Sequence, residues 1–181
     1  LTPVLFAISG RVFVVRAGTA EGRRFGSDGN GDVATNDVTA GDEEGHAVVV
    51  GCGPAGKRVV DAMVEAGTPV VIIELNTRLL DAPQDRVRVV YGDATLPEIL
   101  EKARVPHAKV VVVTVPEPAT VRRVVQNVRT HAIDTRIVAR ARYHLYLDQI
   151  RDAGADEVID EESETGEELA GAALRATGAL P

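Results

Sequence analysis

Runs of β-branched residues alternate with amphipathic segments through most of the chain, and this alternation predicts its elements. The apolar runs indicate strands at 46–51, 69–74, 86–91, 108–115, 135–140 and 156–159. Segments whose apolar residues recur every three or four positions indicate helices near 54–66, 95–104, 117–130, 143–153 and 163–177. Between the second and third strands, the stretch from Asn76 to Asp81 predicts only a turn, where a second helix would otherwise stand.

Regular alternation of strands and helices predicts a parallel sheet that is covered on both faces. The run AKVVVVTV at 108–115 has the near-continuous β-branched character of a central strand buried on both sides. We therefore expect an α/β fold, a Rossmann-like doubly wound parallel sheet of about six strands with helices on both faces. This domain is expected to span residues 46–181.

Two shorter segments precede the expected domain. Residues 17–45 are crowded with Gly, Asp, Asn, Thr and Ala and hold almost no large aliphatic residues, so they predict a flexible linker. Residues 1–16 are largely apolar, but the apolar run is shorter than the roughly twenty residues that cross a bilayer. We interpret them as the end of a truncated transmembrane helix. A packing strand and the remnant of a signal sequence are the alternatives.

The turn after the first strand of the domain carries the clearest candidate chemistry. Gly51, Gly53 and Gly56 fill the pattern G-x-G-x-x-G between an apolar strand and a helix. The first glycine permits a tight turn, the second lets the backbone approach a pyrophosphate, and the third lets the helix lie close to the strand. The following helix points its N–H donors and the positive end of its dipole at the phosphates. The pattern predicts a dinucleotide-type binding site.

Four residues at the ends of later strands extend this candidate site. Glu74 ends the second strand about twenty residues after the glycines, where a carboxylate accepts ribose hydroxyls and repels a 2′-phosphate. Asp93 follows the third strand and would face the adenine, unless it only caps the helix that begins near Leu96. Thr114 would form the floor of the crevice. Arg140 leaves the fifth strand either as an anion or subunit contact or as an exposed charge.

Three other interpretations of the loops fit the sequence poorly. A P-loop requires Ser or Thr after Gly56-Lys57 to hold magnesium, and Arg58 stands there instead. A flavin-dependent disulfide oxidoreductase, which often carries G-x-G-P-A-G, needs a cysteine pair and a second domain, whereas the chain has one cysteine. The calcium-loop-like stretch that starts at Asp28 has Val33 and Thr39 where Gly and Glu are required.

Composition and the lack of a catalytic arrangement argue against several classes of function. A net charge of −7 argues against binding to nucleic acid through phosphate contacts. A single cysteine, Cys52, allows no internal disulfide and is typical of the cytosol. No triad-like or paired-carboxylate arrangement falls in a placed site, and no substrate domain follows the nucleotide fold. We therefore predict a sensor and not an enzyme.

Together these residues resemble the RCK/KTN (Trk-type N-terminal, TrkA-N) nucleotide-binding domain of bacterial potassium transport systems. The resemblance covers about 46–176 and rests on VVVGCGPAG, the acid in VVIIEL, YGDAT with LPEILEKA behind it, IVARAR, and QIRDAGADEVIDEE. The opening LTPVLF is similar to the end of the last membrane helix of a Kef-like CPA2 monovalent cation:proton antiporter. In such proteins a domain of this kind follows through a linker.

The resemblance implies a regulatory domain on the cytoplasmic face of the bacterial cell membrane. It would dimerise through the Rossmann domain, bind NAD(H) or AMP/ATP, and shift the gate of a membrane-embedded antiporter domain. The alternatives are the cytosolic subunit of a Trk- or Ktr-type potassium uptake system and a fragment of an NAD/FAD-dependent oxidoreductase. The implied cofactor contacts are Gly51, Cys52, Gly53, Pro54, Ala55, Gly56, Glu74, Leu75, Asp93, Ala94, Thr114 and Arg140.

One residue departs from the family pattern. Many relatives place Arg at the position of Pro54, where the guanidinium reaches phosphates or the neighbouring subunit. Pro54 removes that cation, so the sequence leaves the choice among NAD, AMP and ATP open. Lys57 and Arg58 are the nearest replacements, although both are expected on the exposed side of the helix.

Overall fold

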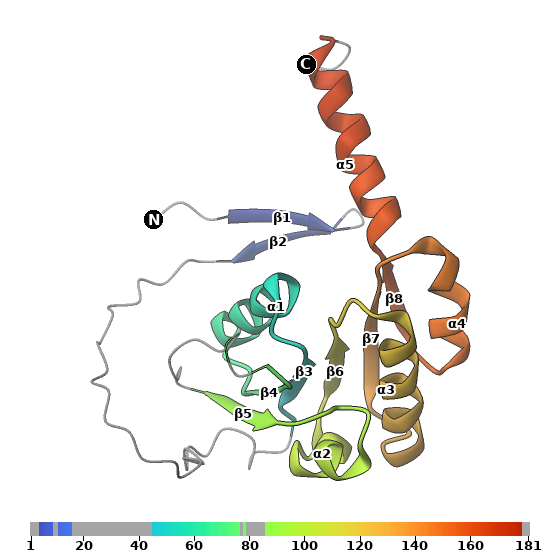
Figure 1. Ribbon diagram of the computed structural model, residues 1–181. Helices are drawn as coiled ribbons and strands as arrows, with labels where there is room; N and C mark the ends of the chain where they lie inside the picture. Colours follow the sequence, from blue (N-terminus) through green and yellow to red (C-terminus); the bar gives the residue numbers. More distant parts are fainter. Residues whose placement is uncertain (1–3, 9–10, 16–44, 77, 79–85, 179–181) are drawn as a thin grey trace.

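The computed structural model describes residues 4–8, 11–15, 45–76, 78 and 86–178, and its main feature is a six-stranded parallel sheet (Figure 1). Its strands are β3 Ala47–Val50, β4 Val70–Glu74, β5 Val87–Tyr91, β6 Val110–Val113, β7 Arg136–Ala141 and β8 Glu157–Asp160. They are ordered β5-β4-β3-β6-β7-β8, so the chain starts in the middle of the sheet and builds outward in both directions. The predicted Rossmann-like fold is confirmed.

The helices lie at nearly the expected places along the chain. They are α1 Pro54–Glu65, α2 Pro97–Lys102, α3 Pro118–His131, α4 Leu147–Asp152 and α5 Glu161–Ala176, with short 3-10 turns η2 Val105–His107 and η3 His144–Tyr146. The first three helices begin at a proline, whose missing N–H and fixed φ suit the first helical position. Proline spacing therefore explains where these helices start.

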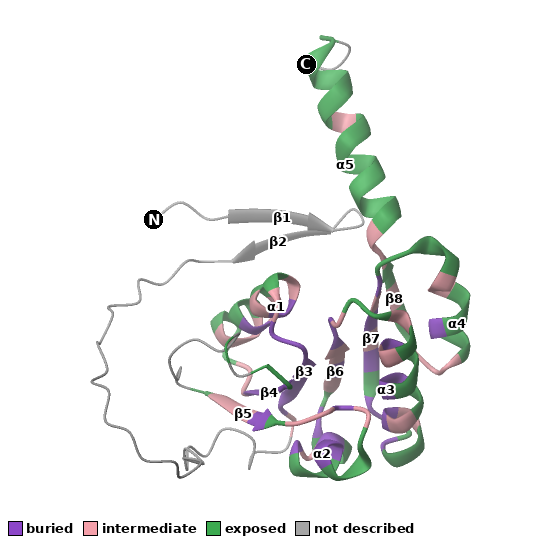
Figure 2. Ribbon diagram, in the orientation of Figure 1, coloured by how far each residue is buried: buried purple, intermediate pink, exposed green. Residues whose placement is uncertain are grey.

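Two apolar clusters lie on opposite faces of the sheet. Val48 and Val50 of β3 face a cluster that includes Ile99 of α2, four valines of α3 and Ile150 of α4. Val49 of β3 faces the second cluster, together with Val60 of α1. Figure 2 shows β3 and β4 as buried strands, which explains why their sequences are continuous β-branched runs. Helices on both faces thus hold the strands.

The first two segments of the chain are only partly described. Val4–Ile8 and Arg11–Val15 form β1 and β2, an antiparallel pair, where the sequence indicated the end of a membrane helix. Two β-branched and aromatic runs separated by Ser-Gly favour such an extended pairing. No helix within the described ranges is long and apolar enough to cross a bilayer. The predicted linker, apart from Gly45, and most of the predicted turn at 76–81 lie outside the described residues.

The last helix, α5, extends away from the sheet (Figure 1), and none of its residues is buried (Figure 2). Its first turn carries the contacts that hold it. The Asp160 carboxylate accepts the N–H groups of Glu162 and Ser163 and also pairs with Nδ1 of His144 at 2.5 Å. The N–H of His144 donates to the Glu162 carboxylate at 2.8 Å. The pKa of His144 is raised by its hydrogen bond to Asp160 and by the charge of that carboxylate.

Substitution of Gly56 tests how closely α1 approaches β3. A Cβ at this position would lie 2.1 Å from the backbone oxygen of Gly51, which is rigid. Gly56→Ala should therefore lower the free energy of unfolding by about 2–3 kcal/mol, although alanine normally favours a helix. At Gly53 a Cβ meets nothing within 4 Å, so Gly53→Ala should change the free energy of unfolding by less than about 1 kcal/mol. Urea denaturation measures both, and equal losses would contradict the close contact.

The pairing at the start of α5 predicts a pH dependence. A histidine whose folded pKa is raised stabilises the fold fully below its unfolded pKa, near 6.5, and loses that contribution as pH rises through the folded pKa. NMR titration should therefore give His144 a pKa above 6.5, and Asp160→Asn should bring it back toward that value. His107, which does not contact Asp160, is the internal control. An unchanged His144 titration in the variant would refute the pairing.

Candidate functional site

The candidate residues gather at the carboxyl edge of the sheet, where the chain reverses its direction of winding. Val50 ends β3 and is paired with Ile73 of β4 and with Val113 of β6. Gly51, Glu74 and Thr114 are therefore the next residues in a single row. This edge is the topological switch point, where open α/β sheets bind their ligands. The fold thus brings together residues that are more than sixty positions apart in the sequence.

Each glycine of the loop has the surroundings that its predicted role requires. Gly51 has φ +93°, and a Cβ there would lie 2.9 Å from the Val115 side chain. A Cβ on Gly56 would strike the Gly51 carbonyl, so this glycine permits the close packing of α1 on the strand. Gly53 faces open space. The backbone is therefore accessible at the one glycine that should approach a phosphate.

The amino end of α1 lacks a side-chain cap. Gly53 is its N-cap residue, Pro54 occupies the first helical position, and no acidic residue stands in the first turn. In contrast, Glu117 accepts two backbone N–H groups at the start of α3, and Asp160 does so for α5. The N–H groups of the first turn of α1 therefore meet no side-chain acceptor from their own cap. Such an end, preceded by a glycine loop, suits a phosphate.

Glu74 joins the glycine loop to the end of β4. Its side chain is buried, with the residue 8% exposed, and Oε2 accepts the N–H of Cys52 at 2.6 Å. Oε1 accepts the N–H groups of Leu75 and Asn76, each at 2.8 Å. A carboxylate offers about four acceptor positions, so one remains beyond these three bonds. A ribose hydroxyl would use that position or replace one of the outer N–H donors.

Four further predicted contacts, in the loop and at the end of β4, take different places. Cys52 is buried in the apolar cluster beneath α1, and its backbone N–H donates to Glu74. Leu75 is 73% exposed, directly after the strand end. Pro54 is exposed and Ala55 is half-buried on the first turn of α1. All four lie along the same edge, but only Cys52 contributes to the core.

Asp93 lies beside this edge and also caps a turn. Gly92 donates its N–H to the backbone oxygen of Glu74 at 3.2 Å, which brings the loop after β5 next to β4. Oδ1 of Asp93 accepts the N–H of Thr95 at 2.8 Å. Hydrogen bonds from the backbone and then the side chain of Thr95 lower the pKa of Asp93. The helix cap foreseen as an alternative is not formed, because α2 begins after Leu96 without a side-chain cap; Asp93 closes a turn with Thr95 instead, as a half-buried residue beside the buried Ala94.

Thr114 lies beneath the glycine loop. Its Oγ1 is 3.0 Å from the backbone oxygens of both Val50 and Gly51, and its single hydroxyl hydrogen can be donated to either. The residue is buried, and its Oγ1 would be 2.9 Å from a Cβ on Gly56. Thr114 thus supports the loop from below, which is where the floor of the crevice was expected.

Arg140 is engaged with a partner that the sequence analysis did not include. Its guanidinium forms an ion pair with Glu161, the first residue of α5, and Nη1 donates to the Thr114 backbone oxygen at 3.3 Å. The strand register explains the pairing, because Arg140 lies beside Ile159 and the chain then leads directly into α5. The acidic run that follows the last strand was the available sequence signal.

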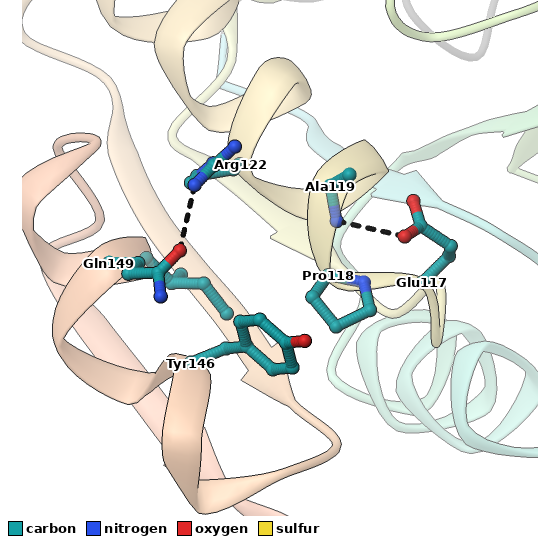
Figure 3. A pocket seen from close by; sticks show the side chains of 7 residues that line it. Glu117, Pro118, Ala119, Arg122, Tyr146 and Gln149 are labelled. Carbon is teal, nitrogen blue, oxygen red and sulfur yellow. Dashed lines mark hydrogen bonds between the residues drawn. The ribbon is translucent and has the colours of Figure 1, made fainter.

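A separate small pocket opens between the first turn of α3 and the η3–α4 segment (Figure 3). Its volume is about 100 Å³, and it holds none of the predicted contacts. Figure 3 shows Arg122 and Gln149 directed toward each other, with Nη1 and Oε1 2.7 Å apart. Glu117 at its edge caps α3. These polar groups already have protein partners, so the pocket does not extend the candidate site.

Comparison with known proteins places this geometry in a family. The TrkA-N domain matches residues 47–161. The putative cation/proton antiporter YbaL of Escherichia coli K12 is 32% identical over 120 residues, which are 66% of this chain and 22% of YbaL. The putative K(+) efflux antiporter KefB of Alkalimonas amylolytica is 27% identical over 92% of this chain and 26% of its own length. The chain therefore spans about a quarter of the length of these relatives.

Solved structures agree with the sequence relatives. The crystal structure of the TrkA-N domain of the Escherichia coli inner membrane protein YbaL is 30% identical, with a TM-score of 0.68 over 72% of this chain and 97% of that domain. The GsuK RCK domain is 27% identical, with a TM-score of 0.64 over 75% of this chain and 29% of that chain. Sequence and structure agree, and the chain belongs to the TrkA-N (RCK N-terminal) domain family, related to the Kef and YbaL cation/proton antiporters.

Proposed function

We propose that this chain is the regulatory domain of a Kef-type monovalent cation:proton antiporter, and that it binds NAD(H) or an adenine nucleotide, AMP or ATP. The order of the strands is the observation that carries this proposal. Along the edge, β5, β4 and β3 are neighbours, and they are followed by Asp93, Glu74 and the glycine loop from Gly51 to Gly56. In an adenine nucleotide the adenine, the ribose and the phosphate follow one another in the same order as Asp93, Glu74 and the glycine loop do along this edge.

The proposed ligand would lie along this row. Asp93 and Ala94 would face the adenine, Glu74 would accept a ribose hydroxyl, and the first turn of α1 would face the phosphate. Toward the other side the sheet continues with β6 and β7, which present Thr114 and Arg140 to the distal part of the ligand. The acid at Glu74 favours NAD(H) over its 2′-phosphorylated form.

Proteins that share the fold support this class of ligand. GsuK has been solved bound to NAD and bound to ADP, and its TM-score to this chain is 0.59 in both cases. The Kef C-terminal domain of Shewanella denitrificans has been solved in an AMP-bound form, with a TM-score of 0.66. Each is 23% identical to this chain, so these likenesses concern the fold. They support an adenine-containing ligand in general.

We propose a regulatory role without catalysis, and the surroundings of the site support it. The glycine loop, Glu74 and Asp93 are occupied with backbone hydrogen bonds, which suits binding rather than proton transfer. Residues 17–45 would connect the domain to a membrane-embedded antiporter domain ahead of it. The domain would then lie on the cytoplasmic face of the bacterial membrane. Nucleotide would act on transport only as far as it binds the two states of the gate with different affinity.

We also propose that the domain forms a homodimer. On the face of the sheet that α1 covers, Val110, Val112 and Val138 of β6 and β7 are only half-buried and belong to neither apolar cluster. Ile159 of β8, on the same face, is exposed. An apolar strip of this kind on a sheet, beside an exposed α5, supports association with a second copy.

Loss of Glu74 should weaken nucleotide binding. Glu74→Ala removes a charged acceptor of ribose hydroxyls, so titration calorimetry should show NADH or AMP bound at least about ten-fold more weakly, equivalent to about 1.4 kcal/mol. Glu65→Ala, which removes the same charge from an exposed position on α1, should bind as the wild type does. Circular dichroism should confirm that both variants are folded. Equal affinities in all three proteins would refute the ribose assignment.

The complete reading frame tests the attachment to an antiporter. Coding sequence upstream of Leu1 should encode a series of membrane helices. The measurement is the genomic sequence itself, followed by cation-dependent proton flux of the full-length protein in proteoliposomes with and without NADH or AMP. A start codon near His46 would instead favour the cytosolic subunit of a Trk- or Ktr-type uptake system.

A further inference from the structure

Arg140 connects the distal end of the candidate site to the start of α5. Its Nη1 contacts the backbone oxygen of Thr114, and the Thr114 hydroxyl contacts the glycine loop at the Gly51 oxygen. On its other side the guanidinium pairs with the Glu161 carboxylate, at the first position of α5. One side chain therefore touches both Thr114, beneath the glycine loop, and the helix that leaves the sheet.

The ion pair is exposed enough to be replaced by another anion. The Arg140 side chain is 25% exposed and the Glu161 side chain is 41% exposed. Water solvates both partners of a partly exposed ion pair when they separate, so the net stability that such a pair contributes is modest. The terminal phosphate of ADP or ATP carries more charge than a carboxylate, the second phosphate of NAD carries as much, and both suit the planar guanidinium. A phosphate that reached Arg140 would therefore compete effectively with Glu161.

The strand order determines which ligands reach so far. A first phosphate would lie at the amino end of α1, above β3, and Arg140 lies two strands farther on, beyond β6. AMP ends at its first phosphate. ADP, ATP and NAD continue with a second phosphate, in the direction of Thr114 and Arg140. Arg140 thus divides the adenine nucleotides into two groups according to whether they carry this second charge.

We propose that Glu161 is an internal competitor for Arg140, displaced by nucleotides with a second phosphate and not by AMP. This inference rests on the proposed nucleotide site and adds to it a residue that determines ligand preference. Displacement would also remove one of the contacts that hold the first turn of α5. This contact matters because no residue of that helix is buried. The His144–Asp160 pair and the Asp160 cap would remain.

The competition is tested by comparing AMP with ADP in calorimetric titrations. Glu161→Gln removes the competing charge, so ADP should bind about 3–10-fold more tightly while AMP changes by less than about two-fold. Glu164→Gln removes an equal charge from an exposed position in the same first turn and should change neither affinity. Arg140→Gln should weaken ADP binding about ten-fold and leave AMP binding nearly unchanged.

Hydrogen exchange measures the effect on α5 independently of affinity. In the wild type, ADP at saturation should speed exchange of the amides in the first two turns of α5 at least about three-fold, and AMP at saturation should not. In Glu161→Gln, those amides should exchange quickly even without nucleotide, whereas Glu164→Gln should match the wild type. Slower exchange with ADP would overturn the proposal.

The outcomes separate this inference from the function on which it rests. Suppose that AMP and ADP both bind, but that Glu161→Gln and Glu164→Gln have the same ratio of ADP to AMP affinity and the same amide exchange in α5. The proposed competition between Glu161 and phosphate would then be wrong, and the nucleotide site would stand. If no adenine nucleotide or NAD binds to any of the proteins, both proposals are overturned. The proposed competition is supported if the preference for ADP over AMP disappears in Arg140→Gln and grows in Glu161→Gln.

Discussion

The close contact between Gly56 and the Gly51 carbonyl is the constraint on which the rest of the site depends. It lets the first turn of α1 lie directly over the end of β3, so that the backbone of the loop and the helix dipole act on the same small volume. A side chain at position 56 would push the helix outward and separate the proposed phosphate site from the residues of the neighbouring strands. Thr114 then supports the loop from below, through its hydroxyl.

Glu74 shows how one residue serves both the fold and the proposed ligand. Its carboxylate holds three backbone N–H groups, one from the glycine loop and two from the chain that leaves β4. Burial of a charge is tolerated here because these donors replace the water that the carboxylate loses. The loop and the ribose position are therefore aligned before any ligand arrives. Such pre-organisation lowers the ordering that binding requires.

Charge is distributed differently at the two ends of the row of candidate residues. Near the adenine end, Asp93 is held by a local turn and remains an acceptor at neutral pH. At the distal end, Arg140 is the one cation among the candidate residues; it contacts the Thr114 backbone oxygen and is paired with an acid from α5. The occupancy of the distal end and the contacts of α5 therefore depend on the same guanidinium, whereas the adenine end is independent of that helix.

The hydrophobic pattern was sufficient to predict the fold, and every strand of the parallel sheet lies within two residues of its expected range. Continuous β-branched runs admit little but buried parallel strands, and prolines mark the starts of α1, α2 and α3. The glycine spacing and the acid at the end of β4 also predicted the candidate site, and the structure brings these residues to one edge of the sheet. These are local signals, because turn geometry, helix starts and burial periodicity act over a few residues.

The sequence by itself determined which residues stand at the strand ends, and only the tertiary structure decided which of them touch. Strand order places Thr114 beneath Gly51, and the register of β7 and β8 brings Arg140 to Glu161. The extended backbone of β1 and β2 also differs from the expected membrane helix, since β pairing depends on a partner strand rather than on composition. Side-chain partners across a sheet follow from packing between distant segments, and no local pattern encodes them.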